Sequence, residues 1–537
     1  MKFRSLYLSA ALALFLAGCS ATKSITAEPI AIPTSITAKK APLSDTQEKR
    51  WSHLDLVKDT IPGMSVDRAY ELLKDRKSTK IVVGVVDSGV DIEHPDLMPV
   101  IWTNPKEIAG NNKDDDNNGY IDDVHGWNFL GDAEHENLEF VRILKKGDDG
   151  SARYKKAKAE YDKEYREAMA EKQKIDGIAN IDKIFQEKTG KKNYTVEDLK
   201  NLKLSDSRLE EAKQGFIGIF SDISKEEFDK EISGAKEHFE NTLKYNLNQK
   251  FDGRSIVGDN PDDINDRKYG NNNVIGPVKD GAKHGTHVAG IIAQVRNNNL
   301  GGDGIASNNV AIMSVRAVPD GDEYDKDVAL AIRYAVDNGA KVINGSFGKY
   351  YSTHSDWVYD AIKYAAQKDV LIVCAAGNES KDLDPAGAVA ERYPNDDMNS
   401  ATEISDNFLC VGAISNAYGP ELIADFSNYG KTDVDVFGPG VQIYATTPNN
   451  TYEFLAGTSM ASPNVAGVAA LIRSYYPNLT ASQVKHILMD SGLPISMDVA
   501  LGGDPKDLRS FSELSRSGRI VNAYNAIILA DKMSRKK

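Results

Sequence analysis

Residues 81–97 read IVVGVVDSGVDIEHPDL and begin with an apolar, mostly β-branched run that ends at Asp87. A run that is apolar throughout is typical of a strand buried on both faces. Five further runs of this kind follow, at residues 311–318, 341–345, 370–376, 408–414 and 434–438. Between them, apolar residues recur at spacings of three and four, which predicts helices. This alternation predicts an α/β fold, a doubly wound and mostly parallel sheet with helices on both faces.

The composition is that of a globular protein with a large apolar core. Of 537 residues, 41% are hydrophobic and 27% charged, and the formal net charge is −14. This negative balance disfavours nonspecific binding to nucleic acid, so we expect no nucleic-acid partner. Three cysteines are too few for a disulfide-rich scaffold or a four-thiolate metal site. Cys374 and Cys410 fall in predicted strands that lie close in the sheet, where geometry rarely suits a bridge, and we expect two buried free thiols.

The first residues predict export. Residues 1–18 carry two basic residues ahead of an apolar run that is too short for an ordinary membrane span, as in a secretory signal peptide. Residues 16–19, LAGC, resemble the lipobox of bacterial lipoproteins, and the alternative is an ordinary signal peptide that contains a cysteine. We expect an exported protein anchored in the cell envelope by a lipid on Cys19. Residues 19–77 should form a tether, flexible to about residue 43, and then an arm packed on the domain.

One long segment interrupts the alternation. We expect residues 132–279 to be a helical insertion in a domain that spans residues 78–531, since 46 of the 110 residues in 141–250 are charged and none is proline. Ser224 with Glu227, and Thr195 with Asp198, have the spacing of helix capping boxes. Seven apolar residues could form one buried face: Tyr161, Tyr165, Ile181, Ile184, Phe185, Phe228 and Phe239. A solvated hairpin with its own small core is weighed against a lid or partner-docking element.

Three polar residues stand where such a sheet gathers its chemistry. Asp87 ends the first predicted strand, His284 opens a helix in HGTHVAG, and Ser459 opens another in GTSMASP. A serine hydroxyl needs a base to take its proton, a neutral imidazole suits that task, and a carboxylate fixes the imidazole tautomer. A helix N-terminus also directs positive partial charge toward a developing oxyanion. The three residues therefore predict an acid, a base and a nucleophile in that order.

The sequences around these residues closely resemble the subtilisin-like serine peptidases, the subtilase family, in which the order is also Asp, His, Ser. The resemblance covers residues 78–131 and 280–531, and it implies a subtilisin-like fold. It gives the role of base to His284 rather than His287. It also implies that the side-chain amide of Asn378, together with the helix start at the nucleophile, forms the oxyanion hole.

The resemblance extends to substrate binding. It implies that Ser346, Phe347 and Gly348 form an edge strand that pairs with an extended peptide backbone. Gly345 departs from the family, whose members usually carry a larger apolar residue at this position. The specificity pocket is therefore not predicted.

Two places could bind calcium, and neither would take part in the chemistry. The resemblance implies a stabilising calcium at Asp96 and Asn298. Separately, residues 114–123 read DDDNNGYIDD, and three of them have the alternating oxygen spacing that begins an EF-hand loop: Asp114, Asp116 and Asn118. His125 occupies the position of the bidentate glutamate, which excludes a full EF-hand. A looser calcium loop that borrows Asp122 or Asp123 is weighed against a polar turn.

Together these features predict a serine endopeptidase that cleaves protein or peptide substrates through an acyl-enzyme on Ser459 and needs no cofactor for the chemistry. An α/β-hydrolase is disfavoured because that fold requires GxSxG and the order Ser, acid, His. One alternative is a noncatalytic envelope module that binds a partner on a peptidase fold. A serine esterase acting at the same residues is another.

Overall fold

The computed structural model describes residues 24–32, 36, 39, 41–384, 392–397 and 402–535, so Cys19 lies outside the described residues. Its main sheet has nine strands in the order β10-β13-β7-β6-β5-β4-β1-β3-β2. The strands are β1 (Ile81–Asp87), β2 (Gly126–Asn128), β3 (Val310–Arg316), β4 (Ala340–Gly345), β5 (Leu371–Ala375), β6 (Phe408–Ile414), β7 (Val436–Pro439), β10 (Leu493–Pro494) and β13 (Arg519–Ile520). Every pairing in it is parallel except that of β10 with β13. The prediction of a mostly parallel α/β sheet is confirmed.

The strand order reverses around β1, which places a binding edge there. β1 pairs with β3 on one side and with β4 on the other, so the chain crosses from one side of β1 to the other between these two strands. Asp87 is the last residue of β1 and lies opposite Arg316 of β3. Ligand sites of open parallel sheets form at the carboxyl ends of strands beside such a reversal.

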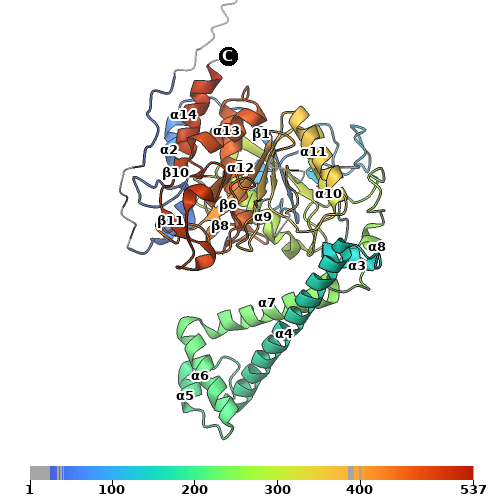
Figure 1. Cartoon of the computed structure of the whole chain (residues 1–537), viewed down its shortest axis with the longest axis vertical. Helices are drawn as coiled ribbons and strands as arrows, with labels where there is room; N and C mark the ends of the chain where they lie inside the picture. Colours follow the sequence, from blue (N-terminus) through green and yellow to red (C-terminus); the bar gives the residue numbers. More distant parts are fainter. Residues whose placement is uncertain are drawn as a thin grey trace, which may run out of the picture.

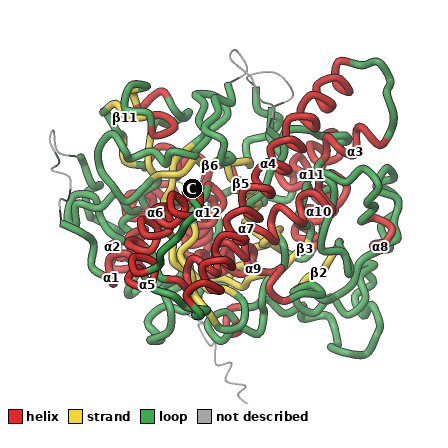
Figure 2. The backbone as a smooth tube through the Cα atoms, turned by 90° about the horizontal axis from the view of Figure 1, so that it is seen from below, coloured by secondary structure: helices red, strands yellow, loops and turns green. Residues whose placement is uncertain are grey.

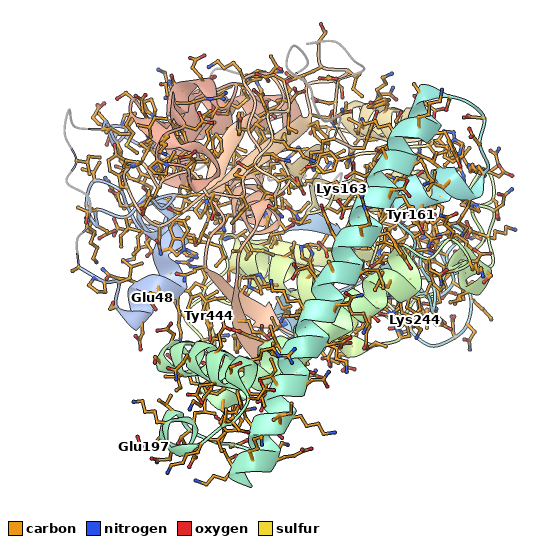
Figure 3. The ribbon with its side chains drawn as sticks, turned by 60° about the horizontal axis from the view of Figure 1, so that its bottom comes forward. Glu48, Tyr161, Lys163, Glu197, Lys244 and Tyr444 are labelled. Carbon is orange, nitrogen blue, oxygen red and sulfur yellow. The ribbon has the colours of Figure 1, made fainter. Side chains whose placement is uncertain are left out.

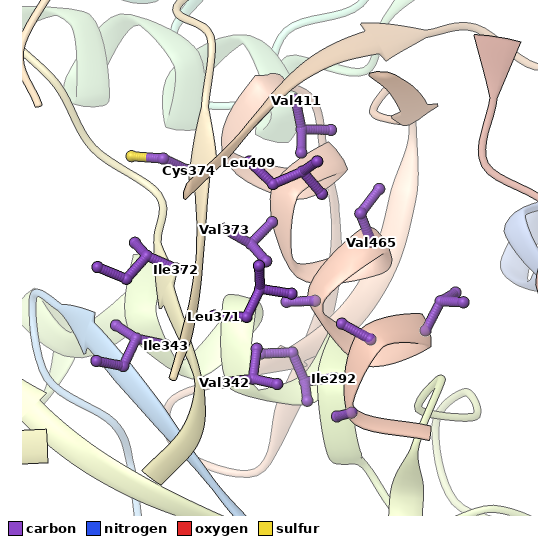
Figure 4. Close-up of a cluster of buried hydrophobic side chains, with 14 of the residues drawn as sticks. Ile292, Val342, Ile343, Leu371, Ile372, Val373, Cys374, Leu409, Val411 and Val465 are labelled. Atoms are coloured by element: carbon purple, nitrogen blue, oxygen red, sulfur yellow. The ribbon is translucent and has the colours of Figure 1, made fainter. Parts of the chain in front are cut away.

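Helices cover both faces of the sheet (Figures 1 and 2). α9 (Lys283–Ala293) and α12 (Thr458–Tyr475) contact each other and pack on one face, whereas α10 (Asp325–Asp337) and α11 (Ser355–Gln367) pack together on the other. Figure 4 shows Val373 of β5 on the side of Val465 in α12, with Ile372 pointing the opposite way. Each central strand is therefore apolar on both faces, as its sequence predicted.

The cysteines behave as expected. Cys374 and Cys410 lie directly opposite each other in the parallel pair β5–β6, and both are buried and free. Burial raises the pKa of the Cys410 thiol far above its usual range.

The N-terminal arm is part of the core. α1 (Asp45–Arg50) leads into Trp51, which is 1% exposed and donates its indole N–H to Val441 O over 3.0 Å. α2 (Val66–Leu73) then packs against α14 (Ala523–Ser534). Residues 24–32 also lie on α14, because Ile25 N donates to Asp531 Oδ2 over 2.9 Å. The expectation of a flexible tether up to about residue 43 is wrong for residues 24–32.

The insertion forms a helical arm that projects from the body (Figure 1). It contains α3 (Glu139–Lys145), α4 (Ala152–Thr189), α5 (Val196–Asn201), α6 (Ser207–Asp222) and α7 (Lys225–Asn241), and α8 (Arg254–Val257) follows on the return path. Both expected capping boxes are present, at Thr195 and at Ser224. With 38 residues, α4 is about 57 Å long. Figure 3 shows Glu197 at the tip of the arm and Tyr161 nearer the body.

The arm has two separate apolar clusters instead of the single buried face that we expected. A tip cluster is built on Phe185, Phe216 and Phe228, whereas a base cluster contains Phe140, Ala157 and Tyr351 of the body. Tyr161 and Phe239 belong to the base, and Ile181 to the tip. The 3.6-residue period reveals that a helix is amphipathic but does not reveal which partner each turn meets. Among the described helices, none combines the length and the apolar character needed to cross a membrane.

Candidate functional site

Asp87 and His284 meet at the carboxyl end of β1. Asp87 is 1% exposed, and its Oδ1 accepts hydrogen bonds from Nδ1 of His284 and from the amide of Ser88, both at 2.7 Å. In the described chain its Oδ2 has no hydrogen-bond partner. His284 is the second residue of α9, and its side chain is 38% exposed. Because Nδ1 is committed to the carboxylate, Nε2 is the nitrogen left to exchange a proton.

Two opposing effects set the protonation of His284. Burial acts to lower its pKa, but the charge of Asp87 and the hydrogen bond to it raise the pKa above the usual value of about 6.5. The other histidines near the site contact backbone. His287 donates to Glu453 O over 3.0 Å, and burial lowers its pKa to about 4. His94 bonds to Thr451 O and His125 to Trp102 O.

Ser459 lies at the start of α12 and is joined to the end of β4. Its Oγ donates to Ser346 O over 3.1 Å, while the Ser346 hydroxyl donates to Ser459 O over 2.8 Å. Asn344 reinforces this link, since its Nδ2 donates to Ser346 Oγ and its Oδ1 accepts from Ser462 Oγ, 2.9 and 2.8 Å. The hydroxyl of Ser459 therefore points at the strand end in this conformation.

Asn378 follows β5, and its amide has a fixed orientation. Its Oδ1 accepts hydrogen bonds from the backbone N–H and the hydroxyl of Thr458, at 2.8 and 2.9 Å. Both of these groups donate, so the oxygen must face Thr458 and the Nδ2 group must face away. The Thr458 hydroxyl in turn accepts from Gly377 N over 3.0 Å. Sequence reasoning missed Thr458, although it stands inside the GTSMASP motif.

A cavity of about 200 Å³ adjoins Ser459 and Asn378. Its other walls include residues 321–323 and the segment of Phe347, Gly348 and Tyr350. A Cβ atom at Gly345 would lie only 3.2 Å from the Phe347 ring, so that ring fills the space of a larger residue at position 345. Arg392 also lines the cavity and donates to Phe347 O over 3.0 Å. No local sequence pattern pointed to this arginine.

The acidic loop gathers a different set of carboxylates from the one we expected. Oxygen atoms of Glu107, Asp114 and Asp116 all lie within 4.8 Å of one another. Glu107 Oε2 is buried and has no hydrogen-bond partner in the described chain. Asn118 does not join them, because its side chain bonds to Tyr120 N and Asp123. The chemistry of this donor set suits a hard cation such as Ca²⁺.

Asp122 and Asp123, the two further acids considered as calcium ligands, already accept hydrogen bonds from other groups of the protein. Asp122 accepts hydrogen bonds from the backbone N–H groups of residues 110–112. Asp123 accepts from Asn104, Asn118 and Tyr334. Burial raises the pKa of Asp123 to about 6. Both side chains stabilise the loop through hydrogen bonds.

Asp96 and Asn298 do meet, but through a hydrogen bond that does not suit a cation. Asn298 presents its Nδ2 group to Asp96 Oδ1 at 2.6 Å, and its own Oδ1 accepts from Leu300 N over 2.9 Å. Calcium needs oxygen ligands, so this arrangement does not fit calcium and we derive no calcium site here.

The chain is similar to a known protein family and to several individual proteins. The family model described as the subtilase family matches residues 78–511. A thermophilic serine proteinase from Bacillus sp. (strain AK1) is 42% identical over 194 residues, which cover 36% of this chain and 42% of that protein. Subtilisin DY from Bacillus licheniformis is 38% identical over 212 residues, 39% of this chain and 70% of that protein. Thermitase from Thermoactinomyces vulgaris is 39% identical over 197 residues, 36% of this chain and 63% of that protein.

Replacing the carboxylate tests the electrostatics of the pair. Asp87→Asn should lower the pKa of His284 relative to the wild type, because the negative charge that raises it is lost. NMR titration of the imidazole resonances measures this pKa, with His284→Gln identifying the signal. Asp280→Asn removes an exposed carboxylate near the start of α9 and should leave the pKa unchanged. An equal pKa in wild type and Asp87→Asn would contradict this account.

Proposed function

The chain belongs to the subtilase family, and on that premise we propose that it is a serine endopeptidase in which Asp87, His284 and Ser459 act as acid, base and nucleophile. The observation that carries the proposal is the 2.7 Å hydrogen bond from His284 Nδ1 to the buried carboxylate of Asp87. It fixes the imidazole tautomer and leaves Nε2 as a proton acceptor. A buried aspartate paired in this way stabilises the imidazolium that forms when the base takes a proton.

Substrate binding would activate the nucleophile. An extended peptide that pairs with Ser346, Phe347 and Gly348 can donate a backbone N–H to Ser346 O, which now accepts from Ser459 Oγ. The displaced hydroxyl can then turn toward His284 Nε2. As Oγ attacks the scissile carbonyl carbon, its proton passes to Nε2. The imidazolium returns this proton to the leaving amine, and water then hydrolyses the acyl-enzyme on Ser459.

The oxyanion would be stabilised by Asn378 and by the start of α12. The hydrogen bonds from Thr458 hold the Asn378 oxygen, so Nδ2 is available as a preorganised donor beside Ser459. An amide donor stabilises negative charge without titrating, and the backbone at the helix N-terminus adds positive partial charge. No cofactor is needed for these steps.

We propose further that the protein is exported and held at the envelope by a lipid on Cys19, as residues 16–19 indicate. Residues 24–32 pack on α14, so only residues 20–23 would separate the lipid from the body. Four residues span at most about 14 Å. The α14 side of the domain would therefore lie close to the membrane.

The cluster of Glu107, Asp114 and Asp116 is our candidate for a structural calcium site. Three carboxylates at this spacing repel one another, and Lys106 Nζ lies 3.7 Å from Asp116 Oδ2. A bound Ca²⁺ would neutralise that repulsion and satisfy Glu107 Oε2. The cation would stabilise the loop and take no part in bond cleavage.

Covalent labelling tests the nucleophile directly. A fluorophosphonate probe should label the wild-type protein at Ser459, and Ser459→Ala and His284→Ala should lose labelling and reduce peptide hydrolysis by at least about 1,000-fold. Ser255→Ala, an exposed serine on the insertion, should behave as wild type. A folded wild-type protein that is not labelled would favour the noncatalytic binding module. Faster turnover of ester than of peptide substrates would favour an esterase.

The oxyanion donor can be tested with two variants at one position. Asn378→Ala and Asn378→Asp should each lower kcat by roughly 100- to 1,000-fold with a small change in KM, since the donor acts on charge that develops in the transition state. Asn378→Asp keeps an oxygen that can accept from Thr458 but replaces the N–H donor with a negative charge, so its loss of activity should be at least as large as that of Asn378→Ala. Full activity of Asn378→Asp, measured on a fluorogenic peptide, would exclude this role.

Calcium should stabilise the folded protein. At a calcium concentration of about 100 times Kd, mass action adds about 2.7 kcal/mol to the free energy of unfolding. Urea unfolding with calcium or with a chelator measures this difference, and Glu107→Gln should abolish most of it. Asp504→Asn, an exposed acid elsewhere, should retain it. Equal stability of the wild type in both conditions would exclude the site.

A further inference from the structure

The base of the arm lies directly behind the cavity that adjoins Ser459. α3, the first helix of the insertion, contacts two of the cavity's walls: the loop of residues 321–323, and the segment of residues 347–350 that continues from the end of β4. These two walls are far apart in sequence. What joins them in space is a set of buried charged groups to which the insertion contributes Glu139 and Arg142.

The side chain of Arg142 binds backbone carbonyl groups of the first wall. Its Nη1 donates to Asp322 O over 2.9 Å and its Nη2 to Glu323 O over 3.0 Å, so one planar guanidinium fixes two consecutive carbonyl groups. The group is 7% exposed and lies over the Tyr324 ring at 3.8 Å. Lysine, with a single ammonium, cannot reproduce this fork.

Glu139 connects the first wall to the second. Its backbone N–H donates to Asp322 Oδ2 over 2.6 Å, and its carboxylate accepts from Arg142 Nε over 3.0 Å and from Lys349 Nζ over 3.2 Å. Lys349 stands between the cavity-lining residues Gly348 and Tyr350, and its Nζ also donates to Glu323 O over 2.7 Å. The two walls are therefore joined directly, by Lys349 to Glu323 O, and also through the buried carboxylate of Glu139, which is 2% exposed.

The arm is anchored at the same place. The base cluster packs Phe140 of α3 against Tyr351, with ring centroids 5.9 Å apart, and Tyr350 lies against the same cluster. Asn246, in the helical turn that directly follows α7, donates to Asp320 O over 3.0 Å. Both ends of the arm thus touch the segments that shape the cavity.

We propose that Glu139 and Arg142 are positioning residues through which the insertion sets the shape of the cavity beside Ser459, and with it the choice of the substrate residue that precedes the cleaved bond. The inference rests on the proposed endopeptidase function. Neither residue lines the cavity, so each acts through the backbone of residues 322 and 323 or through Lys349.

The test uses the full-length protein and a set of fluorogenic peptides that differ only in the residue before the cleaved bond: Phe, Leu, Lys or Glu. Arg142→Lys keeps the charge and loses the fork, and Glu139→Gln keeps the backbone contact and loses the charge. In both variants we expect the ratio of kcat/KM between the best and the worst peptide to fall at least fivefold, mainly through KM. Fluorophosphonate labelling, which needs little of the cavity, should slow less than hydrolysis of the best peptide. Arg166→Lys, the same change on an exposed part of α4, is the matched control.

The outcomes separate the two proposals. An unchanged selectivity ratio in the folded variants would overturn the positioning role, as would a parallel loss of labelling and of all four hydrolysis rates. If Arg142→Lys fails to fold, Glu139→Gln alone decides, with its melting temperature as the check on folding. A folded wild type that is not labelled and cleaves none of the peptides would overturn the endopeptidase function, and the inference with it.

Discussion

The contact between Asp87 and His284 is the constraint on which the site depends, because it places a buried carboxylate and an imidazole from distant parts of the chain within 2.7 Å. It requires α9 to begin almost against the end of β1. A Cβ atom at position 285 would lie 2.2 Å from Gly89 O, so only glycine allows this approach. The glycine in HGTH is thus a geometric requirement of the pair.

A second set of contacts brings the nucleophile to the same edge of the sheet. The end of β4 holds the start of α12 through reciprocal hydrogen bonds between Ser346 and Ser459, and Thr458 holds Asn378. The position of Ser459 is consequently set by backbone and side-chain groups of residues that follow two adjacent strands, β4 and β5. A parallel sheet supplies this rigidity because its strand ends are fixed by pairing on both sides.

Local chemistry explains what the sequence predicts correctly. The strands are revealed by apolar runs, and the capping boxes at Thr195 and Ser224 by residues three apart. The fold and the residues placed at the strand ends follow from such short patterns. Contacts between segments that are far apart in the sequence leave no comparable local pattern. One example is the hydrogen bond from Ile25 to Asp531, which are 506 positions apart. Glu107 joins the acidic loop only after folding, and the two clusters of the arm depend on partners that periodicity does not identify.

The insertion separates Asp87 from His284 by 197 positions and yet leaves their contact intact, which requires its two ends to meet. They meet at Asn128 and Asn271, whose backbone groups exchange hydrogen bonds of 2.9 and 3.0 Å. At the body of the domain, the insertion is therefore closed by a short stem. The entropy cost of closing the long loop concerns only the arm beyond that stem.

Among the helices of the insertion, α3 reaches the walls of the cavity beside Ser459 through buried charged groups. Burying ionised groups is unfavourable unless they are paired and hydrogen-bonded. The buried Glu139 and Arg142 therefore indicate a specific link between the insertion and the domain. Their pairing with residues 322, 323 and 349 ties this part of the arm to the site, whereas the tip packs around an apolar cluster of its own.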